Sequence, residues 1–414
     1  MKHTARTLAG VLALVLVVAG FAPAQTGEGK VAILAGKILT MDANDTVHDN
    51  AVLFLRDGKV EKIEPIRSAG IPADYRVYDH REHWIVPGLI DPHNHTATDV
   101  NGLNETIALT NPGLRAMDIA TLGSNNNDRS LAGGVTTCLM IPGSATNMGG
   151  FGVVVRMGAK RPEDLIMKGY GSLKIAQAGN PERFFFGGNR SYMNYNLRQT
   201  LEKARAYHEA WNAFEAGRSA TKPAYDAVWD GFRGLFRREF PASVHTQIYQ
   251  VVAKTISMLH DEFGLKVMID HGTFDGYKTA EMVRDRGMYA MIGPRVWWMD
   301  PRDRTINGCA ASYAKQGVVK IGLNTDAGVL PQEDLPMQGA MAVRYGWKTY
   351  DALKGMTYWA ADSMNLTDRI GSIAPGLEAD VVAWTGDPID FRSGVERVWV
   401  LGQVAYDASE RRLY

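Results

Sequence analysis

Two histidines separated by one residue end an apolar run in the stretch PGLIDPHNHTA, residues 87–97. Side chains at positions i and i+2 of a β-strand point to the same side, so His93 and His95 would present their imidazoles together. A single buried histidine is more often a packed core residue than a ligand. Two on one face at a strand end favour a divalent metal ion, which imidazole binds well.

Further side chains with ligand or acid–base chemistry end later apolar runs. His245 ends PASVH, His271 ends KVMIDH and Asp326 ends VVKIGLNTD. Lys174 lies inside the apolar stretch GSLKIA, where burying an unpaired ammonium is costly. Residues that collect at the carboxyl ends of successive strands are typical of the catalytic face of a barrel.

The elements that would position these side chains follow an alternating pattern. Eight short apolar runs alternate with longer amphipathic stretches, which predicts an α/β fold with a (β/α)8 TIM barrel over residues 87–369. A helix is predicted over 197–214 from its apolar spacing, within a helical insertion at about 180–240. The eight runs are 85–90, 135–141, 153–157, 172–175, 242–245, 267–269, 288–292 and 318–323.

Both ends of the mature chain read as β-strands. Residues 25–86 contain two apolar runs with Asp57-Gly58 as a hairpin signal, and residues 370–414 contain two more with Gly402 at a turn. Neither end has enough strands to bury a core alone. We therefore expect the two ends to combine into one small β-sandwich domain beside the barrel.

The first 24 residues have the pattern of a secretory signal peptide. A positively charged start is followed by the apolar run 10–21 and by Ala22-Pro23-Ala24, a small-x-small cleavage pattern. The apolar run is shorter than the ~20 residues that span a bilayer, so we expect a periplasmic or secreted protein without stable membrane insertion. An uncleaved membrane anchor is the alternative.

Composition and charge narrow the classes of partner. The 414 residues carry 45 Lys plus Arg and 45 Asp plus Glu, so no global field attracts nucleic acid or a membrane. A small-molecule substrate is expected, and a homo-oligomer stays open. The two cysteines, Cys138 and Cys309, lie far apart in the sequence and form no Cys-x-x-Cys pattern, which predicts two separate thiols.

Motifs along the whole mature chain carry a family resemblance. The chain resembles the amidohydrolase superfamily of metal-dependent hydrolases through PGLIDPHNH, GGVTT (133–137), GLNTDAG (322–328) and GSIAPGLEADVVAW (371–384). Within it, the chain is similar to exported imidazolonepropionase-like and prolidase-like members. The shared stretches are NETIALTNPGLRAMD (104–118), PGSATNMGGFG (142–152) and LKIAQAGNP (173–181).

The resemblance implies a site with two divalent metal ions, zinc being the default. Lys174 matches a lysine that many members carry as an N6-carboxylated bridge between the metals, and an anionic carbamate would remove the cost of a buried ammonium. The chain departs from the pattern at Ala178-Gly179-Asn180-Pro181, where related exported members often read Gly-Glu-Asn-Pro. The implied metal ligands are His93, His95, Lys174, His245, His271 and Asp326.

The implied reaction is hydrolysis of a carbon–nitrogen amide bond, of a dipeptide or an N-acyl amino acid, by metal-activated hydroxide. Asp326 would be the catalytic proton shuttle, a general base and then a general acid. Arg190, Tyr192 and Arg295 are predicted to contact the substrate, and an arginine there could bind a carboxylate. Arg156, near Gly149 and Gly150, is a similar candidate.

Two alternatives stay open on the sequence. One keeps the enzyme class but uses a single metal ion, as a cyclic-amide hydrolase of the imidazolonepropionase type or as a deaminase. Lys174 distinguishes this reading, because a one-metal site needs no bridging carbamate. The other is a binding protein without catalysis, against which the complete set of implied ligands argues.

Overall fold

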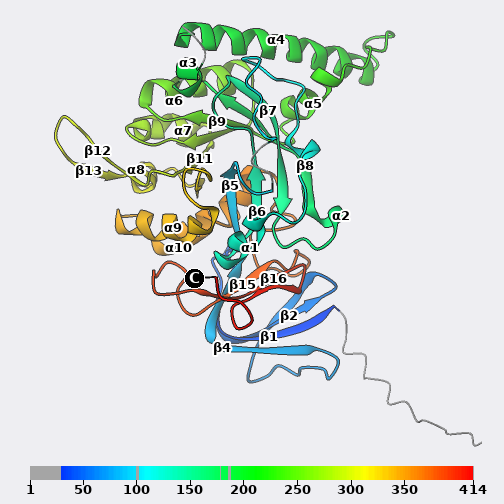
Figure 1. Ribbon diagram of the computed structural model, residues 1–414, viewed down its shortest axis with the longest axis vertical. Coiled ribbons are helices and arrows are strands. Elements are labelled where there is room, and N and C mark those ends of the chain that lie inside the picture. Colours follow the sequence, from blue (N-terminus) through cyan, green and yellow to red (C-terminus); the bar gives the residue numbers. More distant parts are fainter. Residues whose placement is uncertain (1–28, 99–101, 178, 185–187, 414) are drawn as a thin grey trace, which may run out of the picture.

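A computed structural model of the chain describes residues 29–98, 102–177, 179–184 and 188–413. An eight-stranded sheet with its surrounding helices forms the larger part, and a seven-stranded sheet lies below it (Figure 1). The predicted signal peptide falls outside the described residues. No helix in the described part of the chain is long and apolar enough to cross a membrane.

The eight-stranded sheet is the barrel that the apolar runs predict. Its strands follow one another in chain order, and most of their residues are buried because both faces are covered. The strands are β5 (Leu89–Asn94), β6 (Val135–Met140), β7 (Met148–Arg156), β8 (Ile166–Ala176), β9 (Ala242–Thr246), β10 (Val267–His271), β11 (Tyr289–Ile292) and β14 (Ile321–Leu323).

Strand β7 departs from the expected (β/α)8 pattern because it runs antiparallel to both β6 and β8. Only residues 141–147 connect β6 to β7, and a parallel crossover needs a dozen residues or more. The barrel is also not fully closed by ladders. Its first and last strands, β5 and β14, meet through a single bridge between Asn94 and Ala327.

Helices cover the barrel and one of them extends past it. The predicted helix over 197–214 is confirmed as part of α4 (Arg190–Glu215), which lies at the end of the molecule opposite the small sheet (Figure 1). The other α-helices are α1 (Asn125–Ala132), α2 (Pro162–Leu165), α3 (Asn180–Phe184), α5 (Ala227–Phe236), α6 (Tyr249–Thr255), α7 (Ala280–Asp285), α8 (Cys309–Lys315), α9 (Leu335–Arg344), α10 (Thr349–Gly355) and α11 (Tyr358–Ser363). A short ribbon of β12 (Trp297–Met299) and β13 (Ile306–Gly308) precedes α8.

The two chain ends do pair, as expected, but the β-sandwich is not confirmed. Seven strands form one sheet, in which the C-terminal β15 pairs directly with the N-terminal β4. Both predicted turns are present, Asp57-Gly58 between β2 and β3 and Leu401-Gly402 between β16 and β17. The strands are β1 (Lys30–Leu39), β2 (Val47–Arg56), β3 (Lys59–Pro65), β4 (Arg76–Pro87), β15 (Val381–Trp384), β16 (Val395–Val400) and β17 (Gln403–Asp407).

The run 85–90, expected as the first barrel strand, belongs to two elements. Its first half ends β4 and its second half begins β5, with Gly88 between them. A Cβ atom at Gly88 would lie 2.0 Å from Oγ1 of Thr136, so only glycine fits this passage. The small sheet therefore continues directly into the strand that carries His93.

Candidate metal centre

His93 and His95 face the same space at the end of β5. His93 is completely buried on the strand and His95 follows it by two residues, so the strand alternation places both rings on one side. Their Nε2 atoms lie 3.2 Å apart. The spacing in the sequence thus produces the paired imidazoles that it predicted.

Side chains from the ends of three other strands meet this pair. Nε2 of His95 lies 3.0 Å from Oδ1 of Asp326, which follows β14, and Nε2 of His93 lies 3.4 Å from the same oxygen. Nζ of Lys174, on β8, lies 3.2 Å from Nε2 of His93. One ligand atom each from His93, His271 and Asp326 falls within 4.8 Å of the others, a spacing that can hold a metal ion.

The other nitrogen of three of these imidazoles identifies their tautomer. Each Nδ1 lies next to an oxygen that can only accept a hydrogen bond, so Nδ1 carries the hydrogen and Nε2 of the neutral ring keeps a lone pair. The pairs are His93 Nδ1 with Oδ2 of Asp270 at 2.9 Å, His95 Nδ1 with the carbonyl of Ile141 at 2.7 Å, and His271 Nδ1 with the carbonyl of Gly293 at 2.7 Å.

These tautomers leave electron pairs directed at one another. In the neutral rings, Nε2 of His93 and of His95 both face the Asp326 carboxylate with no hydrogen to share. Nε2 of His271 is buried and has no hydrogen-bond partner among the described residues. Such a group of acceptors needs a proton or a cation between its members, so the residues fit a divalent ion.

His245, at the end of β9, lies beside this group. Its ring centroid is 4.5 Å from that of His271, and only 7% of the residue is exposed. Its Nδ1 is buried and without a hydrogen-bond partner in the described part of the chain. This nitrogen is therefore free to act as a ligand.

Burial and neighbouring charges shift the pKa values of Lys174 and Asp326 in ways that suit the site. Burial lowers the pKa of the Lys174 ammonium to about 8, although Asp270 and Asp326 partly oppose this. Burial alone would raise the pKa of Asp326, but a proton on Nε2 of His93 or His95, hydrogen-bonded to this carboxylate, outweighs burial and holds the pKa well below its usual range. Lys174 is therefore easily neutralised, and Asp326 stays anionic.

Asp270 is a functional candidate that the sequence reasoning did not identify. It is completely buried, contacts Nδ1 of His93 and accepts a hydrogen bond from the hydroxyl of Ser243. A carboxylate in this position fixes the ring of a metal-binding histidine and raises its basicity. The available signal was an acid next to His271 inside the apolar strand KVMIDH, since a buried carboxylate needs a partner.

The predicted substrate residues lie at different distances from the histidines. A cavity of about 400 Å³ next to His245 is lined by Arg190, Gln247 and Phe274 among others. The guanidinium of Arg295 stacks at 5.0 Å on the ring of Phe274, just behind that wall. Tyr192 lies on the first turn of α4 with half of its surface exposed and does not line the cavity. Substrate contact by these residues stays a prediction.

Arg156 does not belong to this cavity, contrary to the expectation. It is buried at the end of β7, where it pairs with Glu378 and lies 3.4 Å from Asp380. The reason is the reversed direction of β7, which carries its last residue to the end of the barrel that adjoins the small sheet. Arg156 is thus an ion-pair residue of that junction.

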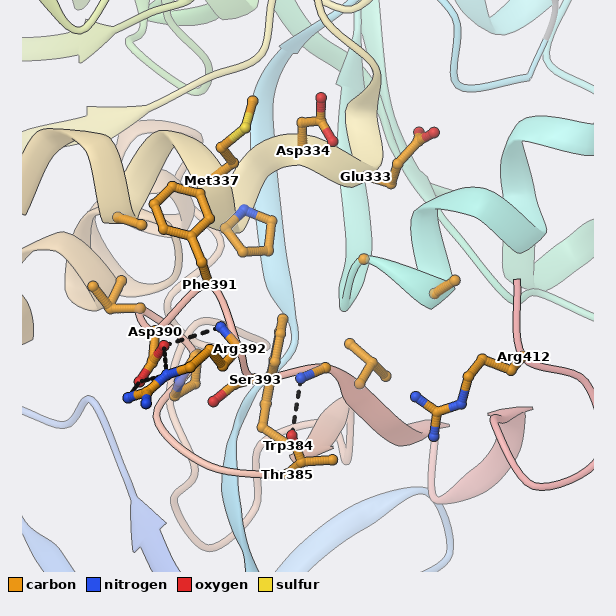
Figure 2. A pocket seen from close by; sticks show the side chains of 18 of the residues that line it. Glu333, Asp334, Met337, Trp384, Thr385, Asp390, Phe391, Arg392, Ser393 and Arg412 are labelled. Atoms are coloured by element: carbon orange, nitrogen blue, oxygen red, sulfur yellow. Dashed lines mark hydrogen bonds and ion pairs between the residues drawn. The ribbon is translucent and has the colours of Figure 1, made fainter. Parts of the chain in front are cut away.

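A larger cavity, of about 520 Å³, lies away from the histidines. Trp384 and Phe391 of the C-terminal segment and Met337 of α9 line it, with Arg412 at one side (Figure 2). None of the six predicted ligands lines this cavity. Of these two cavities, the smaller one alone contacts a predicted ligand, His245.

Comparison with known proteins decides the family. The sequence model of the amidohydrolase family matches residues 84–410, most of the chain. The chain belongs to the amidohydrolase family. The match spans every residue of the candidate metal centre described above, together with the three C-terminal strands, of which β15 pairs with β4.

Individual relatives of this amidohydrolase are distant in sequence. Amidohydrolase tasK of Hapsidospora irregularis is 22% identical over 86% of this chain, which spans 40% of that protein. Imidazolonepropionase of Sphingopyxis alaskensis is 24% identical, covering 86% of this chain and 91% of its own.

Solved structures agree with the fold. An amidohydrolase from Thermotoga maritima MSB8 superposes with a TM-score of 0.80 at 28% identity, covering 91% of this chain and all of its own. A Xaa-Pro dipeptidase with methionine bound in its active site gives 0.56 at 17% identity, over 91% and 100% of the two chains.

Proposed function

We propose that this amidohydrolase-family protein is a metal-dependent hydrolase of amide carbon–nitrogen bonds. The observation that carries the proposal is the meeting of three imidazoles, two of them completely buried, around the Asp326 carboxylate, each with its Nδ1 next to an oxygen. The residues that would hold divalent ions are His93, His95, His245, His271, Asp326 and Lys174. Ions held there supply Lewis acidity and an activated water at neutral pH.

The side chains of this protein would handle the proton. Asp326 stays anionic and is 15% exposed in its side chain, so it can accept a proton from the attacking water. It would then return the proton to the leaving nitrogen, as a general base and afterwards a general acid. Nε2 of His95 lies 3.0 Å from Oδ1 of the same carboxylate.

Lys174 supports a site with two ions. It is fully buried and its pKa is lowered, and the neutral amine is the form that reacts with CO2. The resulting carbamate would be an anion between His93 and the further ligands. In this proposal Lys174 is N6-carboxylated, and the ions are zinc by ligand type.

For the substrate we propose a dipeptide or an N-acyl amino acid. The cavity next to His245 carries the guanidinium of Arg190, whose contact with Glu182 is long at 3.6 Å, so it can bind a substrate carboxylate. The structural likeness to a Xaa-Pro dipeptidase is compatible with this class. We also propose that the protein is exported, because its first 24 residues have the pattern of a signal peptide.

A one-metal cyclic-amide hydrolase is the second candidate. One ligand atom each from His93, His271 and Asp326 lies within 4.8 Å of the others, and three such ligands suffice for a single ion. An imidazolonepropionase is among the relatives.

A substrate screen of the zinc-loaded protein against dipeptides, N-acyl amino acids and cyclic amides separates these proposals. Hydrolysis of dipeptides or N-acyl amino acids, with KM raised by Arg190→Met, is the expected result. Exclusive turnover of cyclic amides would reject the first substrate class.

A further inference from the structure

The barrel has a join between its first and last strands that no ladder closes in the described residues. β14 is only three residues long, and one bridge, from Asn94 to Ala327 in the segment that follows β14, links this part of the chain to β5. The amide of His95 donates to the carbonyl of Ala327 at 2.8 Å in the same place. The two chain segments that carry His93 and Asp326 therefore meet where the sheet provides little backbone pairing.

A buried carboxylate spans this join. Asp91, on β5, accepts a hydrogen bond from the hydroxyl of Thr325 at 2.6 Å and from its backbone N–H at 3.3 Å. The same carboxylate accepts the backbone N–H of His93 at 3.4 Å. One side chain thus holds both the peptide that enters His93 and the residue that precedes Asp326.

The backbone of Asp326 needs such support. Its φ is +50°, in the left-handed region that residues other than glycine seldom adopt. Thr325, immediately before it, is completely buried and donates twice to Asp91. The two hydrogen bonds fix the orientation of the chain as it enters the strained residue.

Two amide side chains extend the contact to the helices. Nδ2 of Asn94 donates to Oδ2 of Asp91 at 3.1 Å and to Oε1 of Gln332 at 2.9 Å. Nε2 of Gln332 donates to the carbonyl of Asn126 at 2.7 Å and to the hydroxyl of Ser130, both on α1. A connected and satisfied buried network of this kind rigidifies the elements it joins.

We propose that Asp91, Asn94 and Gln332 form a polar clasp that closes the barrel between β5 and β14 and positions His93 and Asp326. Asp91 is a positioning residue, because it acts through the His93 backbone and through Thr325. The inference rests on the proposed metal-dependent function, since the clasp matters for holding ligands in place. Apolar packing could also close the join, but it would not fix the direction of two peptide units.

Thr325 offers a test that spares the carboxylate itself. Thr325→Val keeps the shape but removes the hydroxyl, and Thr325→Ser keeps the hydroxyl. Thr200→Val is the matched control, because it removes another buried hydroxyl, which donates to the carbonyl of Asn196 at 3.0 Å within α4, far from the join. Zinc dissociation constants are measured by competition with a chromophoric chelator, and hydrogen exchange of peptide 89–97 is measured in the metal-free protein.

The clasp predicts that Thr325→Val weakens zinc binding about tenfold to a hundredfold, the usual cost of losing support for a ligand. Exchange at the His95 amide should rise in the same variant. Thr325→Ser should restore both values, and Thr200→Val should leave both unchanged. Asp91→Asn should shift both in the same direction as Thr325→Val.

Wild-type zinc affinity and exchange in Thr325→Val would overturn the clasp. His93→Ala in the same assay tells this failure from failure of the proposed function. If His93→Ala loses zinc while Thr325→Val keeps it, only the clasp is wrong. If His93→Ala itself keeps full zinc affinity, the proposed metal centre is wrong, and the proposed clasp is then rejected as well.

Discussion

His93, His95 and His271 direct Nε2 toward the Asp326 carboxylate. They do so because the Nδ1 atom of each ring lies next to an oxygen on its other side. A carboxylate at His93 and backbone carbonyls at His95 and His271 each take the Nδ1 hydrogen. The residue types and their positions at strand ends were predictable from the sequence. The outer partners were not, because the carbonyls of Ile141 and Gly293 belong to other strand ends and carry no sequence signal.

Lys174 should decide the number of metal ions. Lys174→Ala removes the amine that would become the bridging carbamate, so we expect loss of the second ion and a fall in kcat of more than about a hundredfold. Elemental analysis and steady-state kinetics measure the two effects. Lys174→Arg should not rescue either, because a guanidinium forms no carbamate and stays cationic beside the metals.

A short carboxylic acid in solution provides the positive control for Lys174→Ala. It should partly restore metal content and rate by occupying the vacated space. Two ions per chain in Lys174→Ala without added acid would show that the lysine is no bridge. That result would favour the one-metal candidate.

The elements reproduce the predicted runs in position but not always in direction. β7 is reversed because its connection to β6 is too short for a crossover. An apolar run does not encode the direction of its strand, although the length of residues 141–147 offered a signal. The reversal places Gly149 near Lys174 and sends Arg156 to the opposite end, which is why one prediction in this strand failed.

Two lysines stabilise the end of α11. Nζ of Lys168 donates to the carbonyls of Met364 and Glu239, at 2.8 and 2.7 Å, and Nζ of Lys266 donates to that of Asp362 at 2.8 Å. Cations are favourable at a helix C-terminus. Lys168→Met should therefore lower the free energy of unfolding by about 2 kcal/mol in urea titrations.

Lys160→Met is the control for this change. Lys160 is exposed and makes one longer contact, 3.3 Å from Nζ to the carbonyl of Val404. Its replacement should change stability by less than about 0.5 kcal/mol. Equal effects of the two substitutions would mean that the contacts to α11 contribute little.

His80 should make the small sheet sensitive to acid. Burial, and then the positive charge of Arg397, lower the pKa of His80 to about 4 in the folded protein, below the ordinary value of 6.5. The unfolded chain therefore binds a proton that the folded chain does not between these values. The contribution of neutral His80 to the free energy of unfolding is fully present above pH 6.5. It is lost as the pH drops toward 4, by up to about 3 kcal/mol.

His80→Gln tests this assignment. Glutamine can still accept the hydrogen bond that Nη1 of Arg397 donates to Nε2 of His80 at 2.9 Å, but it does not titrate. Urea unfolding at pH 7.5 and pH 4.5 should show a smaller loss of stability in the variant. An unchanged pH dependence would assign the acid sensitivity to other groups.

On the scale of the whole molecule, strand β4 connects the two sheets and leads directly into β5. The pairing of both chain ends was predictable, because neither has enough strands to bury its own apolar residues. Their arrangement as one sheet was not, since edge-to-edge and face-to-face pairing bury the same alternating residues. In the structure, β4 pairs with β1 on one side and with β15 on the other, so the strands of both chain ends form one sheet.

The metal centre is the central claim, and zinc titration of the metal-free protein tests it most directly. Binding is followed by calorimetry for the wild-type protein, for His93→Ala and His271→Ala, and for the control His260→Ala. His260 lies in the helical segment 256–262 that follows α6, and 21% of its side chain is exposed. We predict two zinc ions per wild-type chain, an unchanged titration for His260→Ala, and loss of most binding in the other two variants. Full zinc binding by both His93→Ala and His271→Ala would contradict the proposed metal-dependent hydrolase.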